Sequence, residues 1–332
     1  MSPSPAEELL SSLPLFAGLA ADELEEVAWL ARPVSFSAGE EIFHQGDASR
    51  EMYVIAKGRV RVRIRLAAEA QIEATVLGPG ELLGEMALLD GGVRSATAVA
   101  LEPTRGYSIS AAAFGALCAD FRPGAFKLLV ALARLGLERF ATSAARHHGP
   151  NLLLSTLRPA PDVAAPGTNR PRPAPVAVGI DAAASLPVFR AFSRHELSDL
   201  FRRAGRIDLE QREVLFRAGD AASSCFIVLR GALEMLLPRG GCFQRLAILG
   251  PGELAGYSAL LRDGARSEVC RARGRASLLE IDRAVFGELS AHLPVVAFKF
   301  LIALNGSIAS ALRSSNSTLV RRRAESQETG RS

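Results

Sequence analysis

The sequence predicts a mainly β protein with flanking helices, built as two tandem copies of one unit. Three observations lead to this prediction. Short apolar stretches alternate with polar residues between glycines such as Gly39, Gly46 and Gly58, a pattern typical of strands joined by turns. Stretches of helical periodicity flank these strands. The same landmarks return later in the chain at a nearly constant offset, which indicates a tandem duplication.

The first copy should open with a helix. Residues 1–12 are small and polar, so we expect a flexible start. Leu24, Val27, Ala28 and Ala31 then fall on one face at helical spacing, with acidic residues in the first turn. The chain from this point should form one amphipathic helix before the strands begin.

Strands and two further helices should follow in the first copy. The segment from Arg59 to Leu66 alternates strictly, so its four arginines should share one solvated sheet face. A helix is expected near Ala111 and a longer one from about Gly124. The apolar face predicted for the longer helix comprises Phe126, Leu129, Val130, Ala133, Leu137 and Phe140.

The repeat defines the domains. Leu186-Pro187-Val188-Phe189 echoes Leu13-Pro14-Leu15-Phe16 at an offset of 173 (186 − 13), and Arg266-Ser267 echoes Arg94-Ser95 at 172 (266 − 94). A segment rich in proline and alanine separates the copies, which is typical of a semi-stiff linker. The predicted divisions are a flexible start (1–12), domain 1 (13–145), linker (146–182), domain 2 (183–313) and a polar, basic tail (314–332).

One stretch carries the candidate chemistry. Gly84-Glu85-Met86-Ala87-Leu88-Leu89 is followed by Arg94-Ser95-Ala96-Thr97, nine residues after the glutamate (94 − 85 = 9). Gly84 permits close approach of a ligand, and the planar guanidinium of Arg94 suits phosphate oxygens. Glu85 can only accept hydrogen bonds, so it suits a ribose hydroxyl and can also hold the arginine. Met86 to Leu89 can form one helical turn with N–H groups facing an anion. The pattern predicts a pocket for one small phosphorylated sugar.

This stretch resembles the phosphate-binding cassette of the cyclic-nucleotide-binding domain family, which includes kinase regulatory subunits and catabolite-activator-type regulators. The resemblance implies two eight-stranded antiparallel β-rolls, of the jelly-roll-like double-stranded β-helix kind, with flanking helices. It also implies that Glu85 takes the ribose 2′-hydroxyl and that Arg94 takes the cyclic phosphate. The backbone amides of Met86, Ala87 and Ser95, beside Ala96, would complete the cradle. The ligand implied is cyclic AMP or cyclic GMP, and Ser95 does not decide between them.

The second copy has a modified cassette, Gly256-Tyr257-Ser258-Ala259-Leu260-Leu261 followed by Arg266 and Ser267. Tyrosine stands where the first copy has Glu85, while the arginine keeps its spacing (266 − 257 = 9). A phenol brings no negative charge and fills more space. Three interpretations stay open: the second pocket binds nothing, binds a cyclic nucleotide weakly, or prefers another phosphorylated ligand.

Composition and motifs limit the function classes. Four cysteines lie without C-x-x-C spacing, which argues against a zinc site or a disulfide framework and favours a cytoplasmic protein. No signal peptide is recognisable, and the most apolar run, near Phe298 to Leu312, is interrupted by Lys299 and Asn305, so we expect no membrane span. No catalytic motif, cofactor or metal site is expected, nor a direct DNA-binding domain in residues 314–332.

The function that these observations favour is a receptor without enzymatic activity, which changes conformation on ligand binding and regulates an unidentified protein partner. The sequence also allows a homodimer through the C-terminal helices. Two alternatives remain: a transcription regulator that acts through a partner, and a scaffold of cyclic-nucleotide-binding folds that have lost their ligand.

Overall fold

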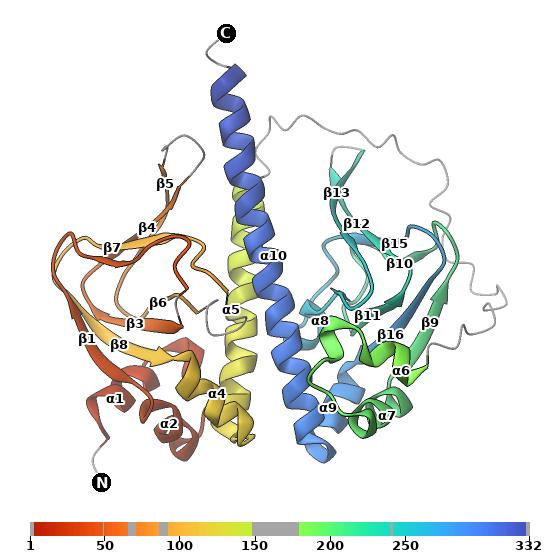
Figure 1. The fold of residues 1–332 in the computed structure, drawn as a ribbon, viewed down its shortest axis with the longest axis horizontal. Coiled ribbons are helices and arrows are strands. Elements are labelled where there is room, and N and C mark those ends of the chain that lie inside the picture. Colours follow the sequence, from red (N-terminus) through yellow and green to blue (C-terminus); the bar gives the residue numbers. More distant parts are fainter. Residues whose placement is uncertain are drawn as a thin grey trace. The chain divides into compact units, whose positions relative to one another are not determined.

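The computed structural model describes residues 3–48, 50–65, 71–85, 92–147, 179–239 and 242–329. These form two compact units, each described here by itself (Figure 1). Unit 1 comprises residues 1–149 together with 305–332, and unit 2 comprises residues 150–304.

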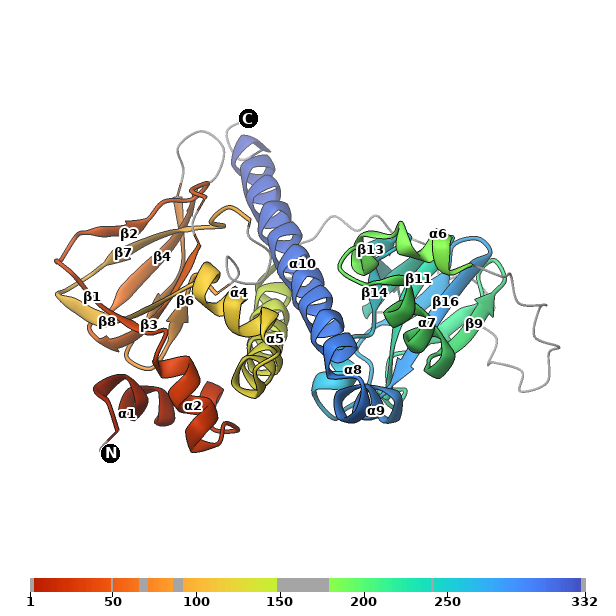
Figure 2. The ribbon, with the colours of Figure 1, turned by 60° about the horizontal axis from the view of Figure 1, so that its bottom comes forward.

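Unit 1 is a β-roll of two four-stranded antiparallel sheets, with strand orders β1-β8-β3-β6 and β2-β7-β4-β5. Its strands are β1 (Arg32–Phe36), β2 (Glu41–Phe43), β3 (Glu51–Lys57), β4 (Val60–Arg65), β5 (Gln71–Leu77), β6 (Leu82–Leu83), β7 (Thr97–Ala100) and β8 (Thr104–Ser110). Its helices are α1 (Pro5–Ser11), α2 (Ala21–Ala28), α4 (Ala111–Ala119) and α5 (Pro123–His147), with a 3₁₀ turn η1 (Pro14–Phe16). The helices flank the roll, whose core lies between the two sheets (Figure 2).

Unit 2 repeats this architecture, with strand orders β9-β16-β11-β14 and β10-β15-β12-β13. Its strands are β9 (Gly205–Leu209), β10 (Val214–Phe216), β11 (Ser224–Arg230), β12 (Leu233–Arg239), β13 (Cys242–Leu249), β14 (Leu254–Ala255), β15 (Val269–Ala272) and β16 (Ala276–Asp282). Its helices are α6 (Ile180–Ala184), α7 (Arg194–Arg203), α8 (Ser258–Leu261) and α9 (Arg283–His292), with a 3₁₀ turn η3 (Pro187–Phe189). The predicted fold class, two tandem β-rolls with flanking helices, is confirmed.

The repeat extends to irregularities of the sheets. The β3–β8 ladder has a bulge between Ile55 and Lys57, and the β11–β16 ladder has one 173 residues later, between Val228 and Arg230 (228 − 55 = 173). In the β4–β5 ladder the extra residue lies in β5, where Ala74 stands between the partners of Val62 and Arg63, and Arg61 forms an ion pair with Glu73 of β5. Bulges bend strands and adjust their twist, so their repetition shows that both rolls curve in the same way.

The chain before the first roll is more ordered than the sequence suggests. Residues 5–11 form α1 rather than a flexible start, because Ser4 and Glu7 make a capping box and Leu10 is fully buried. The following turn η1 buries Phe16, as η3 buries Phe189 in unit 2. The repeated Leu-Pro-x-Phe motif is thus a buried turn beside each roll.

The longest helix, α10 (Pro294–Thr329), begins in unit 2 and from Asn305 onward belongs to unit 1. It continues through residues 314–329, where the sequence predicts a tail. Of the predicted linker 146–182, α5 includes the first two residues and α6 begins at Ile180, while 148–178 lie outside the described residues. The predicted domain boundaries remain predictions.

One helical stretch meets the length and composition expected of a membrane span. Among the described residues, Pro294–Arg313 form 20 residues of apolar helix, longer than the interrupted run near Phe298 to Leu312 from which we expect no membrane span. More than half of its most apolar window, 56%, is buried inside the protein. A core helix has the same properties, so this stretch is weak evidence for a membrane.

An ion pair between helices recurs in both units. Lys127 of α5 approaches Glu23 of α2 at 2.6 Å, and Lys299 of α10 approaches Glu196 of α7 at 2.7 Å. The hydrogen bond from Lys127 is the main cause that lowers the pKa of Glu23. Burial tends to raise the pKa of Glu196, but Lys299 and the cap at Ser193 outweigh it and lower that pKa.

These pairs predict an acid-sensitive contribution to stability. Since both folded-state pKa values lie below the ordinary value of 4.5, the pairs stabilise the fold at neutral pH. That stabilisation is lost as the pH falls through 4.5 toward the lower folded values. Lys127→Met and Lys299→Met should therefore lower the free energy of unfolding in urea at pH 7 and change it progressively less below pH 4.5. An equal loss at every pH would contradict this account.

Candidate functional site

Arg94 is the centre of the cassette in unit 1. Only 3% of its surface is exposed, and its guanidinium donates hydrogen bonds to two backbone carbonyls. Nη1 lies 3.1 Å from the Gly84 oxygen, and Nη2 lies 2.6 Å from the Glu51 oxygen at the start of β3. The backbone of Arg94 is also fixed, because its N–H donates to Asp47 O and its carbonyl accepts from Gly46 N–H, both at 2.9 Å. Both the backbone and the guanidinium of Arg94 are therefore held in place by hydrogen bonds.

Aromatic side chains support this guanidinium. Its carbon lies 3.9 Å above the ring of Phe43 and 5.8 Å from the ring of Tyr53. Such cation–π contacts stabilise a cation that has lost water. Burial lowers the pKa of Arg94, but an arginine keeps its charge at any ordinary pH. Tyr53 donates to the Glu51 carboxylate at 3.0 Å, and burial followed by this bond raises the pKa of Tyr53 to about 12.

Gly84 has a backbone conformation that explains its identity. Its φ is +78°, a region that favours glycine, and a Cβ added there would collide with the Arg94 guanidinium and approach the Glu51 carbonyl at 3.0 Å. The sequence suggests that this glycine admits a ligand, and in the structure the group that lies against it is the Arg94 guanidinium.

Glu85 is buried, with 3% of its surface exposed, and forms an ion pair with Arg139 of α5. Arg139 also donates from Nη2 to the Leu82 carbonyl at 2.6 Å. Among the described residues, Glu85 forms its ion pair with Arg139 rather than with Arg94, although its charge also favours the protonated form of Arg94. The pair instead connects the cassette directly to the long helix α5.

Loss of this pair should destabilise unit 1. Arg139→Ala leaves the buried Glu85 carboxylate without its cation. Breaking a fully buried ion pair costs about 3–5 kcal/mol of unfolding free energy. Because the Arg139 side chain is 32% exposed, we expect a smaller loss, about 2 kcal/mol. Urea unfolding measures the change. The double variant Glu85→Gln/Arg139→Ala should recover part of the loss, because no unpaired charge remains. Equal stabilities of the single and double variants would show that the charge of Glu85 is not what matters.

The second cassette keeps the arginine and its support. Arg266 is 6% exposed and donates from Nη1 to Gly256 O at 2.9 Å and from Nη2 to Ser224 O at 2.5 Å. Its guanidinium carbon lies 4.2 Å above the ring of Phe216, which corresponds to Phe43 (216 − 43 = 173). Burial lowers the pKa of Arg266, as it does for Arg94.

Three charged residues in or around the first cassette have uncharged counterparts in the second copy. Tyr257 occupies the position of Glu85, and Ser224 occupies that of Glu51 (224 − 51 = 173). Ala311 occupies the position of Arg139 (311 − 139 = 172), at the same offset that separates Lys127 from Lys299. Both members of the Glu85–Arg139 pair have therefore changed together. Burial raises the pKa of the Tyr257 phenol above its ordinary value, and Glu268 and Cys225 add to this effect, so the phenol is neutral.

The remaining predicted site residues lie as follows. Ser95 is half-buried and Ala96 is buried next to Arg94, whereas Met86 and Ala87 lie outside the described residues. In unit 2, Ser258 begins the short helix α8 and Ser267 is exposed. The amide of Ala259 donates to Gly256 O at 3.1 Å, the same carbonyl that accepts from Arg266.

A family model described as "Cyclic nucleotide-binding domain" matches residues 33–121 and 206–292, one stretch in each unit. The chain belongs to the cyclic nucleotide-binding domain family. The two stretches contain both arginines and both cassettes, so the predicted family and its tandem arrangement are confirmed.

Curated members of this family show how much of the chain is related. A "Cyclic AMP receptor protein" of Thermus thermophilus is 38% identical over 152 residues, 44% of this chain and 70% of that protein. A "cAMP-dependent protein kinase type II regulatory subunit" of Drosophila melanogaster is 38% identical over 94 residues, 28% of this chain and 25% of that protein. An "Acetyltransferase Pat" of Mycolicibacterium smegmatis is 35% identical and covers 40% of this chain and 39% of that protein. The shared part is thus a domain that occurs in proteins of different activities.

Two solved structures of the family are also similar. The Thermus thermophilus catabolite activator protein is 36% identical and covers 40% of this chain and 66% of that chain, with a TM-score of 0.34. The regulatory domain of Toxoplasma gondii PKA with cAMP is 16% identical and covers 87% of this chain and 92% of that chain, with a TM-score of 0.32.

The structure adds residues that sequence reasoning missed. Glu51 and Phe43 come from strands far from the cassette in sequence, and no motif marks them. Arg139 could have been found, because the offset of 172 places alanine at its position in the second copy, where Glu85 is also replaced. Paired changes between internal repeats are therefore a usable signal for contacts.

Proposed function

We propose that this protein is a cyclic-nucleotide receptor whose ligand site lies in unit 1. The observation that carries the proposal is the buried, preorganised Arg94, held by the carbonyls of Gly84 and Glu51 beside the carboxylate of Glu85. A fixed cation beside a hydrogen-bond acceptor suits a phosphate joined to a ribose. Cyclic AMP is the first candidate, as the name of the Thermus thermophilus relative suggests, and cyclic GMP is the second.

The Glu85–Arg139 pair provides a physical route for a response. A ribose hydroxyl that donates to Glu85 competes with Arg139 for the same carboxylate oxygens. Ligand binding should then alter the contact between the cassette and α5. It can shift the equilibrium between two positions of α5 by no more than the difference in the ligand's binding free energy for those two positions. A change of α5 would alter affinity for a protein partner, as expected of a regulatory, non-enzymatic protein of the cytoplasm.

Calorimetric titration of the full chain with cyclic AMP and cyclic GMP tests the proposal. Arg94→Ala should weaken the site in unit 1 by one to two decades, since a hydrogen bond to a charged group contributes about 1.5–3 kcal/mol. Arg266→Ala is the matched control, because it removes the equivalent buried arginine from unit 2 and should leave that site intact. Binding that survives Arg94→Ala unchanged, or no binding of either nucleotide by the unmodified chain, would overturn the proposal and favour a scaffold.

A further inference from the structure

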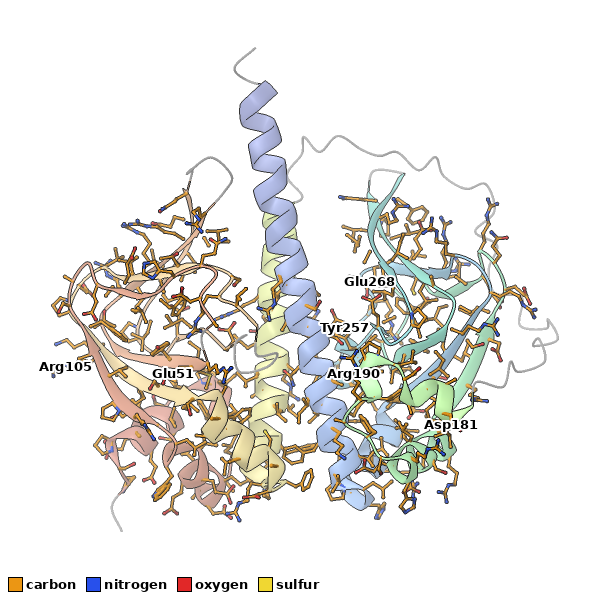
Figure 3. The ribbon with its side chains drawn as sticks, viewed as in Figure 1. Glu51, Arg105, Asp181, Arg190, Tyr257 and Glu268 are labelled. Atoms are coloured by element: carbon orange, nitrogen blue, oxygen red, sulfur yellow. The ribbon has the colours of Figure 1, made fainter. Side chains whose placement is uncertain are left out.

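The helix α8 in the cassette of unit 2 is too short to be stable on its own. It has four residues, Ser258–Leu261, and directly follows Tyr257, which is labelled in Figure 3. A single helical turn fixes several residues for few hydrogen bonds, so it forms only where other contacts support it. The last carbonyls of any helix also lack partners within it. The order of α8 therefore depends on neighbouring groups, and Figures 1 and 2 show α9 beside it.

Arg283, the first residue of α9, supplies this support. Its Nε donates to the Ala259 carbonyl at 2.6 Å, and its Nη2 donates to the carbonyl of Arg262, directly after α8, at 2.7 Å. Nη2 also donates to the Ala222 carbonyl before β11 at 3.2 Å. Basic side chains can satisfy the last carbonyls of a helix in this way. One guanidinium therefore joins α8, α9 and the segment before β11.

The residues that follow α8 are held as well. Arg283 forms an ion pair with the Asp263 carboxylate, whose side chain is 93% exposed, so water screens this pair and its contribution is small. The amide of Ala222 donates to Gly264 O at 3.0 Å. The segment from α8 to Gly264 is thus attached to the rest of unit 2 mainly through its backbone carbonyls.

The first copy lacks the side chain that makes these contacts. Ala111 begins α4 at the position of Arg283 (283 − 172 = 111), and its methyl group has no donor. The two positions are equivalent in the fold, because the amide of Arg283 donates to Ser223 O and that of Ala111 donates to Arg50 O (223 − 50 = 173). The first cassette is joined to α5 through a carboxylate, for which a ligand hydroxyl can compete, whereas Arg283 binds carbonyls of the cassette backbone itself.

We propose that Arg283 is a built-in clasp that keeps the second cassette ordered when no ligand is bound. The guanidinium gives α8 in advance the support that a bound ligand would otherwise have to provide. A ligand that meets the same arrangement before and after binding shifts no equilibrium. The second roll should therefore act as a fixed element of the protein and not as a sensor. The inference concerns unit 2 alone and holds whether or not unit 1 binds a ligand.

Hydrogen exchange of the full chain without ligand tests the clasp. The amides of Ala259, Leu260 and Arg262, which donate within this turn, should be protected in the unmodified chain. Arg283→Ala should make them exchange roughly tenfold faster or more, because α8 loses its outside support. Arg283→Lys should keep only part of the protection, since an ammonium lacks the planar fork of donors. Arg262→Ala is the matched control, because it removes an exposed guanidinium from the same segment and keeps the carbonyl.

Three results would overturn the inference. One is exchange in Arg283→Ala at the rate of the unmodified chain. Another is an equal loss of protection in Asp263→Ala, which would mean that the exposed ion pair holds the segment and the carbonyl contacts do not. The third is slower exchange of α8 when cyclic AMP or cyclic GMP is added to the Arg94→Ala chain, which would mean that a ligand orders the second cassette. If Arg283→Ala unfolds unit 2, as loss of protection in β11 would show, Arg283→Lys supplies the same test.

Discussion

Replacing Gly84 with alanine should abolish ligand binding by unit 1 and lower its free energy of unfolding by about 2–4 kcal/mol. Part of this loss comes from backbone strain, because a φ of +78° costs an alanine about 1–2 kcal/mol. The rest comes from the collision of the new Cβ with the Arg94 guanidinium, which must leave the carbonyls that it holds. Urea unfolding and calorimetry with cyclic AMP measure the two effects.

Gly39 provides a matched control for this substitution. Its φ is +83°, almost the same as that of Gly84, but no atom lies within 4 Å of an added Cβ. Gly39→Ala should therefore lose only the strain contribution, about 1–2 kcal/mol, and keep full ligand affinity. If both variants lose the same stability and both still bind, the contact between Gly84 and Arg94 has no role in the site.

Gly136 of α5 gives the second large effect. It is buried, and a Cβ at this position would lie 2.7 Å from Cγ2 of Ile308, a β-branched side chain that is itself 1% exposed. Because neither partner can move freely, Gly136→Ala should destabilise unit 1 by about 1–3 kcal/mol, although alanine favours a helix more than glycine does. The midpoint of urea unfolding should fall accordingly.

The control substitution for this prediction should raise the stability instead of lowering it. Gly306 lies in α10 only two residues before Ile308, and nothing lies within 4 Å of an added Cβ. Gly306→Ala should therefore stabilise the protein by about 0.5–1 kcal/mol through helix propensity and the lower entropy of the unfolded chain. A gain of stability in both variants would show that the segment from residue 305 does not pack against α5 in solution.

The sequence predicts the fold well because the repeat and the strand pattern are local or periodic. The repeated landmarks, the strands between glycines and the arginine of each cassette all depend on residues near one another or at a fixed offset in the chain. The start of the chain was predicted wrongly because the capping box of Ser4 and Glu7 outweighs a composition that suggests flexibility.

The site is predicted less completely, because its supporting contacts join distant segments. Arg94 donates to Glu51 across 43 residues, and Glu85 pairs with Arg139 across 54 (139 − 85). The face of α5 shows the same limit. Leu129, Ala133 and Leu137 are buried as expected, whereas Phe126 and Val130 are only half-buried. Periodicity locates an apolar helix, but tertiary packing decides which side of it is covered.

Unit 1 is made of two pieces of chain that are synthesised at different times. Asn305 of α10 is fully buried and donates to the Leu129 carbonyl of α5 at 3.1 Å, across 176 residues, and Arg313 donates to Val93 O at 2.9 Å, across 220. At a synthesis rate of about 5–20 residues per second, Leu129 waits roughly 10–35 s for its partner. During this interval the face of α5 that Ile308 later covers is open to water and to other nascent chains. The first unit to emerge from the ribosome is therefore the one that needs residues beyond position 304 before its packing is complete.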